Sequence, residues 1–191
     1  MSNVARVTLG GTADTALGIV LLGDYDEPML PAPRQRFVEV PGRAGRYEFD
    51  GDMGPRMLNL RFAIVDATTR AGLASLIRDL TDLLLDNDGR PTDTTIVFDK
   101  ESTKTYTARY AGRVPLDRLV GGTVGEFALP MLCSDPYAYG AEDSDTFTIT
   151  AATQEEDVVN AGDFKTPAVI TLTVNSGTIT GFDLLCRSLK T

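Results

Sequence analysis

The sequence predicts a mainly β fold with one amphipathic helix, an α+β class in which strands supply most of the core. Three observations lead to this prediction. Short segments that alternate apolar and polar residues recur along the chain. Only one segment, residues 68–89, has apolar residues at helical spacing. Glycine and proline, 18 and 10 of the 191 residues, often stand between these segments, where turns are expected.

The first part of the chain is expected to hold short strands and one long loop. Residues 4–11 (VARVTLGG) alternate and then end on two glycines, and residues 16–23 (ALGIVLLG) form a short apolar run that ends at a glycine. Residues 24–33 (DYDEPMLPAP) contain three prolines, which lack the amide donor that a central strand needs. We therefore expect an extended, exposed loop there.

A β-hairpin is expected between Phe37 and Phe49. Its turn, PGRAGR, has a proline that presets φ and two glycines that permit positive φ. The next segment, PRMLNLRFAIVD, is the longest predicted strand of this region. Its apolar residues recur at every second position, which indicates one buried face: Leu58, Leu60, Phe62 and Ile64.

The helix is expected within residues 68–89, where helical spacing predicts one buried face made of Leu73, Leu76, Ile77, Leu80, Leu83 and Leu84. Thr68 or Thr69 can cap its first turn, and Gly89 followed by Pro91 is expected to end it. Burying six aliphatic side chains yields about as much free energy as ordering the segment costs. The helix should therefore be stable only when it docks on a sheet.

After the helix the pattern returns to strands. Residues 94–99 and 105–112 are expected to form a hairpin, as are residues 113–122 and 123–132, with Gly121 and Gly122 at the second turn. CSDPYAYG and a polar linker follow, and then three further strands are expected at 145–151, 167–177 and 178–188. We therefore predict two domains, residues 1–140 and 141–191. The second is a short β segment whose apolar face must be buried against the first domain or another chain.

Composition argues against several function classes. A formal charge of −9 disfavours binding to phosphate backbones, and the chain has no histidine, the commonest general base and metal ligand. The two cysteines, Cys133 and Cys186, are expected to be reduced and half-buried. No catalytic residue, metal ligand set or cofactor motif is found. The chain also lacks an apolar run long enough for a membrane span or a signal peptide, so we expect a cytosol-like compartment.

One alternative to a structural role is a carbohydrate-binding β-sandwich. Flat aromatic rings beside a carboxylate suit sugar stacking, and Asp135, Tyr137 and Tyr139 offer that combination. The same residues also suit a turn, because Asp-Pro starts turns and tyrosines often tether two layers. A third hypothesis, an enzyme, has no constellation of residues to support it.

The ordered pieces of the chain resemble the distal tail proteins of long-tailed bacteriophages, the siphophage tail family. The resemblance rests on LGI (residues 17–19) and the proline-containing loop, on VPGRAGRYEFDG (40–51), on the strand and helix, on the IVFD…YTARYAG hairpin and on CSDPYAYG (133–140). Residues 160–180 also resemble the start of the family's galectin-like second domain. Ala44 departs from the polar residue that is commoner there, and the C-terminal part is too short for a full galectin-like sandwich.

The resemblance implies a structural virion protein that acts in the tail and catalyses nothing. Residues 1–140 would be a β-sandwich or split-barrel domain that assembles with other copies into a ring, generally a hexamer, at the distal end of the tail tube. The ring would join the tail tube protein to the hub or tip protein of the baseplate and leave a channel through which DNA passes without specific binding. It implies no cofactor and no membrane insertion, and assembly in the host cytoplasm.

Two groups of residues are candidate functional positions under this hypothesis. The Pro-rich loop and the hairpin turn are exposed and stiff, so we expect them to contact ring neighbours or tail partners. Their residues are Asp24, Tyr25, Pro28, Pro31, Pro33, Pro41, Gly42, Arg43, Gly45 and Arg46. The second group forms an interdomain elbow in which the chain turns out of the ring domain: Asp135, Pro136, Tyr137 and Tyr139.

Overall fold

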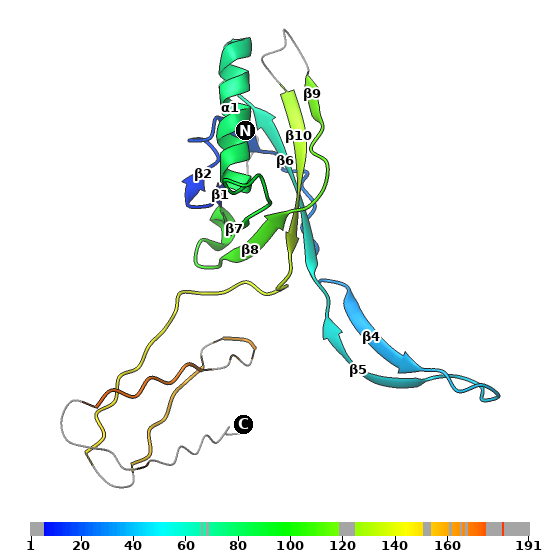
Figure 1. Ribbon diagram of the computed structural model, residues 1–191, viewed down its shortest axis with the longest axis vertical. Helices are drawn as coiled ribbons and strands as arrows, with labels where there is room; N and C mark the ends of the chain where they lie inside the picture. The colour runs from blue at the N-terminus through cyan, green and yellow to red at the C-terminus, as the bar shows by residue number, and fades with distance from the viewer. Residues whose placement is uncertain are drawn as a thin grey trace. The chain divides into compact units, whose positions relative to one another are not determined.

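The computed structural model in Figure 1 describes residues 6–65, 67, 69–118, 125–150, 154–160, 162–164, 166, 168–174 and 181. The chain divides into two compact units, Met1–Asp143 and Ser144–Thr191. The elements of the first unit are β1 (Val7–Leu9), β2 (Thr12–Ala13), β3 (Ile19–Leu21), β4 (Pro33–Val38), β5 (Tyr47–Met53), β6 (Arg56–Ile64), α1 (Arg70–Leu84), β7 (Asp93–Phe98), a 3-10 turn η1 (Asp99–Glu101), β8 (Tyr106–Tyr110), β9 (Leu116–Arg118) and β10 (Gly125–Cys133). The predicted mainly β class with one helix is confirmed.

One antiparallel sheet organises the first unit. Its strand order is β2-β1-β7-β8-β10-β6-β3, and β9 also pairs with β10. β10 pairs along its whole length with β6, so β8 and β9 share its other edge, β8 near Met131 and β9 near Gly125. The predicted hairpin of β7 and β8 is present. The predicted Gly121–Gly122 turn between β9 and β10 lies outside the described residues.

The core lies on one face of this sheet. All four residues predicted for the buried face of β6 have at most 1% of their surface exposed. Val7 of β1, next to one end of the strand order, and Ile19 of β3, at the other end, belong to the same buried cluster. Neighbouring strands lie about 4.8 Å apart, so a flat sheet of this width would separate those side chains widely. The sheet therefore curls around its own apolar face, as strands of a barrel do.

The helix α1 lies inside the predicted segment. Thr69 caps it, because its Oγ1 accepts a hydrogen bond of 3.0 Å from the Gly72 amide, while Thr68 lies outside the described residues. The helix ends at Leu84, earlier than predicted, because Leu85 takes an extended conformation and forms a β-bridge with Pro91. Gly89, with φ of 73°, serves the turn between them.

The predicted six-residue buried face of the helix is partly wrong. Leu73 and Leu84 are buried, but Ile77 is 38% exposed, and Leu76, Leu80 and Leu83 only pack against the core from its margin. The physical reason is the curl of the sheet, which encloses most of the core by itself. Only a few residues of α1 are therefore buried against the core.

The second unit differs from the prediction in its described part. The described residues within 145–151 and 167–177 have no strand pairing, although strands were predicted there, and the third predicted strand lies outside the described residues apart from Gly181. Apolar side chains such as Val169, 94% exposed, and Ile149 remain open to solvent. An alternating segment becomes a strand only when a neighbour supplies the ladder of hydrogen bonds, and sequence alternation does not identify that neighbour.

Candidate functional site

The hairpin of β4 and β5 forms a two-stranded sheet of its own, separate from the large sheet. We call it the arm. In Figure 1 it begins where β6 begins and extends away from the large sheet. Its register pairs Phe37 with Glu48 and Val38 with Tyr47, which confirms the predicted hairpin, and the register shifts between Arg34 and Arg36. Every residue of its two strands is exposed, so the arm contributes nothing to the core.

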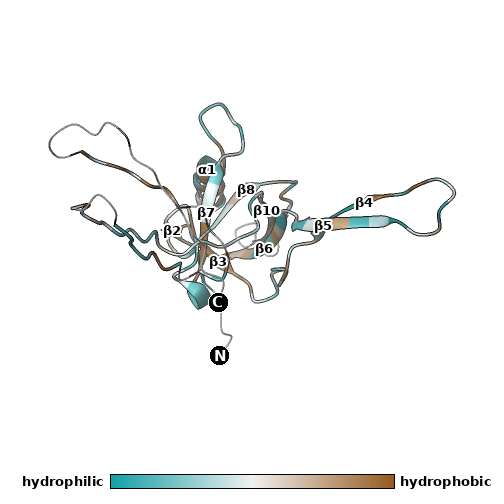
Figure 2. Cartoon of the chain, turned by 90° about the horizontal axis from the view of Figure 1, so that it is seen from below, coloured by the Kyte–Doolittle hydropathy of each residue, from teal (hydrophilic) through white to brown (hydrophobic). Residues whose placement is uncertain are grey.

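The arm nevertheless carries large apolar side chains. Figure 2 shows hydrophobic bands along β4 and β5. The exposed apolar residues of its strands and turn are Phe37, Val38, Val40, Tyr47, Phe49 and Met53. The register places Val38, Tyr47 and Phe49 on one face of the arm and Phe37 on the other. Exposed apolar side chains gathered on one hairpin mark interaction sites. An isolated two-stranded hairpin is also marginally stable in water. Both facts indicate that the arm is a binding surface for another molecule.

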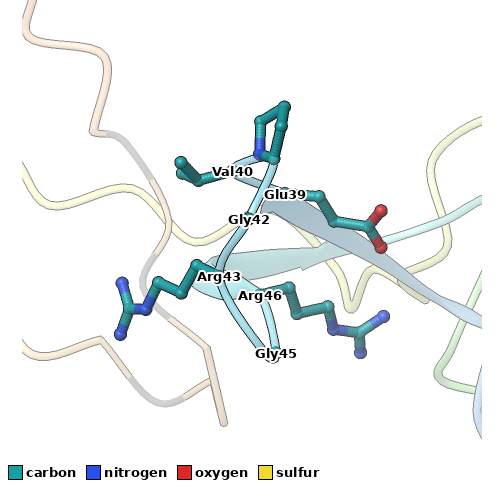
Figure 3. A pocket seen from close by; sticks show the side chains of 7 residues that line it. Glu39, Val40, Gly42, Arg43, Gly45 and Arg46 are labelled. Atoms are coloured by element: carbon teal, nitrogen blue, oxygen red, sulfur yellow. The ribbon is translucent and has the colours of Figure 1, made fainter.

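The turn at the end of the arm presents two arginines. Gly42 and Gly45 have φ of 85° and 84°, a conformation that side chains disfavour, so the glycines of PGRAGR are required there. Figure 3 shows Arg43 and Arg46 extending away from each other on opposite sides of the turn, which encloses a shallow hollow. The Arg43 guanidinium lies 3.9 Å from the centre of the Tyr47 ring, and that of Arg46 lies 4.5 Å from the centre of Phe37.

Two ion pairs connect charged side chains of the arm. Arg36 forms an ion pair with Asp52, and Arg46 lies 3.6 Å from Glu48. All four side chains are exposed, and exposed pairs contribute about 0–1 kcal/mol each. Among the described residues Arg43 has no ion pair, so its stacked guanidinium remains available to an acidic or carbonyl group of a partner.

The Pro-rich loop is held to the first unit at its start. The Tyr25 ring stacks on Phe98 with centres 5.7 Å apart, and Lys100 forms an ion pair with Glu27 while lying over the Tyr25 ring. Partial burial tends to lower the pKa of Lys100, but its contacts with Glu27 and Tyr25 outweigh that effect and raise it. Asp24 is also engaged, in an ion pair with Arg61. These contacts fix the loop in place.

The middle of the loop is open to contact. Met29 and Leu30 are 86% and 69% exposed. Pro31, predicted to be an exposed contact residue, is instead buried. Sequence reasoning named Asp24 and Tyr25 but not this apolar pair. The two adjacent apolar residues between prolines were the signal that could have found it, since exposed apolar pairs on stiff loops favour binding.

The predicted elbow is a compact turn after β10. The Asp135 carboxylate accepts a hydrogen bond of 3.1 Å from the Tyr137 amide and one of 2.6 Å from the Tyr139 hydroxyl. The backbones of Tyr139 and Thr105 exchange two hydrogen bonds, which tie the elbow to the residue before β8. The structure therefore brings the four elbow residues together. Their interdomain role stays a prediction.

Arg56, which sequence reasoning did not single out, joins three of these features. It is the first residue of β6 and directly follows Gly54 and Pro55, which we call the root of the arm. Its side chain donates hydrogen bonds to the carbonyl of Pro136 in the elbow, at 3.1 Å, and to the carbonyl of Pro28 in the Pro-rich loop, at 2.9 Å. It also lies over the Tyr106 ring at 5.4 Å. Nothing in the local sequence distinguishes Arg56 from the other arginines, because its partners lie 28 and 80 residues away.

The described residues offer little that suits reaction chemistry. They contain no group of three or more His, Cys, Asp or Glu side chains that could hold a metal ion. Cys133 is a free thiol, fully buried rather than half-buried, and burial raises its pKa to about 11. One surface hollow lies at the turn of the arm and another at the C-terminal end of α1, and neither is lined by Tyr137 or Tyr139. No helix in the described part of the chain has the length and apolar character needed to cross a membrane.

Comparison with known proteins gives the class of this fold. Residues 15–133 match the model of the phage tail protein RIFT-related domain, and the chain belongs to this family. The match includes the Pro-rich loop, the arm, α1 and the strands from β3 to the end of β10. The family resemblance predicted from the sequence is thereby confirmed, and the chain is a phage tail protein, a component of the virion.

A solved structure shows the same fold. The crystal structure of the Dit protein (gp 19.1) of phage SPP1, described as a paradigm of the hub adsorption apparatus in phages that infect Gram-positive bacteria, matches with a TM-score of 0.59. The two are 22% identical, and the match covers 73% of this chain and 53% of the Dit chain. The matched part is thus about half the length of the Dit chain. No curated protein matches the chain.

Proposed function

We propose that this protein forms a ring at the distal end of the tail tube and that the arm is the main contact between neighbouring copies. The ring, generally a hexamer in proteins of this kind, joins the tail tube protein to the hub or tip protein. DNA passes through its channel without being bound specifically. The protein works as a structural part and not as an enzyme.

The observation that carries the proposal is the exposure of the whole arm. Phe37, Tyr47 and Phe49 stand in solvent on a hairpin that has no core of its own. A ring closes through heterologous contacts, in which one surface of a copy binds a different surface of the next. The arm extends away from the large sheet (Figure 1), and all residues of its strands are exposed, so it can reach a different surface on the next copy.

Light scattering measures the molar mass of the purified protein and so tests whether it forms a ring. We expect the native protein to form a ring-sized species, alone or after addition of tail tube protein. The Phe37→Ser, Phe49→Ser double variant should remain monomeric with unchanged thermal stability, because both side chains are exposed. Val65→Ser, an exposed apolar residue outside the arm, is the matched control and should assemble normally. A native protein that stays monomeric under all these conditions, or a double variant that assembles like the native protein, would contradict the proposal.

A further inference from the structure

The root of the arm, the Pro-rich loop and the elbow meet at one side chain, that of Arg56. We propose that Arg56 is a positioning residue that holds these three segments in a single arrangement. The direction in which the arm leaves the sheet and the path of the chain after β10 are then set together. The role of this coupling in assembly depends on the proposed function, whereas the coupling itself does not.

The geometry of the Arg56 side chain explains how one residue can hold several segments together. A guanidinium is planar and carries five N–H donors in fixed directions, so it can hold two acceptors at a set angle. Nε donates to the Pro136 carbonyl and Nη1 to the Pro28 carbonyl, at 3.1 and 2.9 Å. The Tyr106 ring supports the guanidinium from the core side at 5.4 Å.

The two acceptors explain why a side chain, and not a strand ladder, holds the loop and the elbow. Pro28 and Pro136 have no amide hydrogen, so neither residue can join a strand ladder through its own donor. Their carbonyls still need partners when they are withdrawn from water. Arg56 supplies both partners, and it does so from the first position of β6, which the long β6–β10 pairing holds in place.

The two strands of the arm approach each other closely at its root, two residues before Arg56. A Cβ atom added at Gly54 would lie 2.6 Å from the Ala32 carbonyl oxygen, and the Gly54 amide donates a hydrogen bond of 3.0 Å to that same oxygen. Pro55 then leads directly into Arg56. The chain therefore has little freedom between the arm and the guanidinium that holds the loop and the elbow.

Each of the three segments contains a hydrogen-bonded amide that can report on the coupling. The Asp26 amide in the loop binds the Asn59 carbonyl, the Gly54 amide at the root binds Ala32, and the Tyr139 amide in the elbow binds Thr105. If Arg56 holds the segments together, its loss should increase the opening of all three. Amide hydrogen exchange measures such local opening directly.

The experiment compares hydrogen exchange in the full chain carrying Arg56→Lys or Arg56→Gln. Lysine keeps the charge but lacks the rigid plane that places Nε and Nη1 at two separate acceptors, so it cannot hold both carbonyls in the same arrangement. We expect exchange at least about tenfold faster in peptides covering the loop, the arm root and the elbow, since bonds from charged donors are the stronger ones. The β6–β10 ladder should be unaffected. Arg109→Gln is the matched control, an arginine on β8 that pairs with Asp93 at 3.0 Å, and should leave all three segments unchanged.

Four results would overturn the inference. The first three are unchanged exchange in both Arg56 variants, acceleration in fewer than three of the segments, and the same acceleration in Arg109→Gln. A general acceleration across the β6–β10 ladder would also overturn it, because it would show loss of overall stability in place of local positioning. A native protein that forms no ring would refute the proposed function, and the exchange result would still decide the role of Arg56.

Discussion

The Tyr139 hydroxyl donates a hydrogen bond of 2.6 Å to the Asp135 carboxylate, four residues earlier in the chain. The same carboxylate accepts the Tyr137 amide, so a single acidic side chain closes the turn that follows β10. This use of the carboxylate also bears on the carbohydrate alternative, because a sugar hydroxyl would have to compete with Tyr139 for Asp135.

The first prediction concerns the ionisation of Tyr139. The hydrogen bond to Asp135 raises the pKa of the Tyr139 phenol above 10.0, since ionisation would remove the donor and place two negative charges side by side. Asp135→Asn should therefore lower the pKa of Tyr139. The ultraviolet absorbance of the phenolate measures it, and Tyr139→Phe identifies which part of the titration belongs to this residue. An unchanged titration would show that the bond does not persist in solution.

The second prediction concerns alkaline pH. Burial raises the pKa of the Cys133 thiol from 9.0 to about 11. Below pH 9 the thiol is neutral in both the folded and the unfolded state and does not affect the pH dependence of stability. Between about pH 9 and 11 the unfolded chain releases the proton while the folded chain retains it, so the free energy of unfolding should fall with rising pH, by about 2–3 kcal/mol in total.

Denaturant unfolding of the native protein and of Cys133→Ala across this pH range measures that difference. The variant should lack this part of the decline, although other groups that titrate there will act on both proteins equally. If the free energy of unfolding changed equally with pH in the two proteins, the prediction that burial raises the pKa of Cys133 would be wrong. Rapid alkylation of Cys133 at pH 8 in the folded protein would contradict it as well, because only an exposed thiolate reacts readily.

The third prediction separates the buried from the exposed residues on the predicted apolar face of α1. Leu73 is buried, so Leu73→Ala should lower the free energy of unfolding by about 2–5 kcal/mol. Ile77 is mostly outside the core, so Ile77→Ala should cost less than about 1 kcal/mol in the monomer. Chemical denaturation at a concentration where the protein is monomeric measures both values. Equal losses would mean that the helix buries its whole apolar face, as periodicity alone suggested.

The fourth prediction concerns Asp14, a carboxylate that is 1% exposed at the edge of the sheet. It accepts hydrogen bonds from the Thr15 amide at 2.8 Å and from the Leu21 amide of β3 at 3.4 Å. Asp14→Ala would leave these donors unpaired and should cost about 1–3 kcal/mol in the free energy of unfolding. Asp14→Asn keeps one acceptor oxygen and should cost less. Unfolding curves that place the two variants in the opposite order would contradict this role.

Much of the first unit could be predicted from the sequence because its signals are local. Alternation along 55–66 predicted the buried face of β6, and PGRAGR predicted a turn with two glycines at positive φ. Both depend on the conformation of neighbouring residues, which sequence patterns report directly. The helix was found for the same reason, but its ends and the exposure of Ile77 depend on what packs against it.

The second unit shows the limit of the same reasoning. Segments 145–151 and 167–177 also contain apolar residues at alternating positions, yet their described residues have no pairing. A strand is defined by its neighbour, and sequence alternation identifies only a possible face. The exposure of the arm was equally hidden, because Phe37 and Phe49 have the residue types of a buried sheet.

The sequence by itself determined the class of the fold, the positions of most elements in the first unit, the turn of the arm and the family to which the chain belongs. Only the tertiary structure decided that the arm stands apart from the core, that the Pro-rich loop is held by Tyr25, and that Arg56 connects the arm root to the elbow. The reason is physical. Turns and amphipathic faces arise from residues a few positions apart, whereas burial and long-range hydrogen bonds depend on segments that meet only when the sheet has curled and closed.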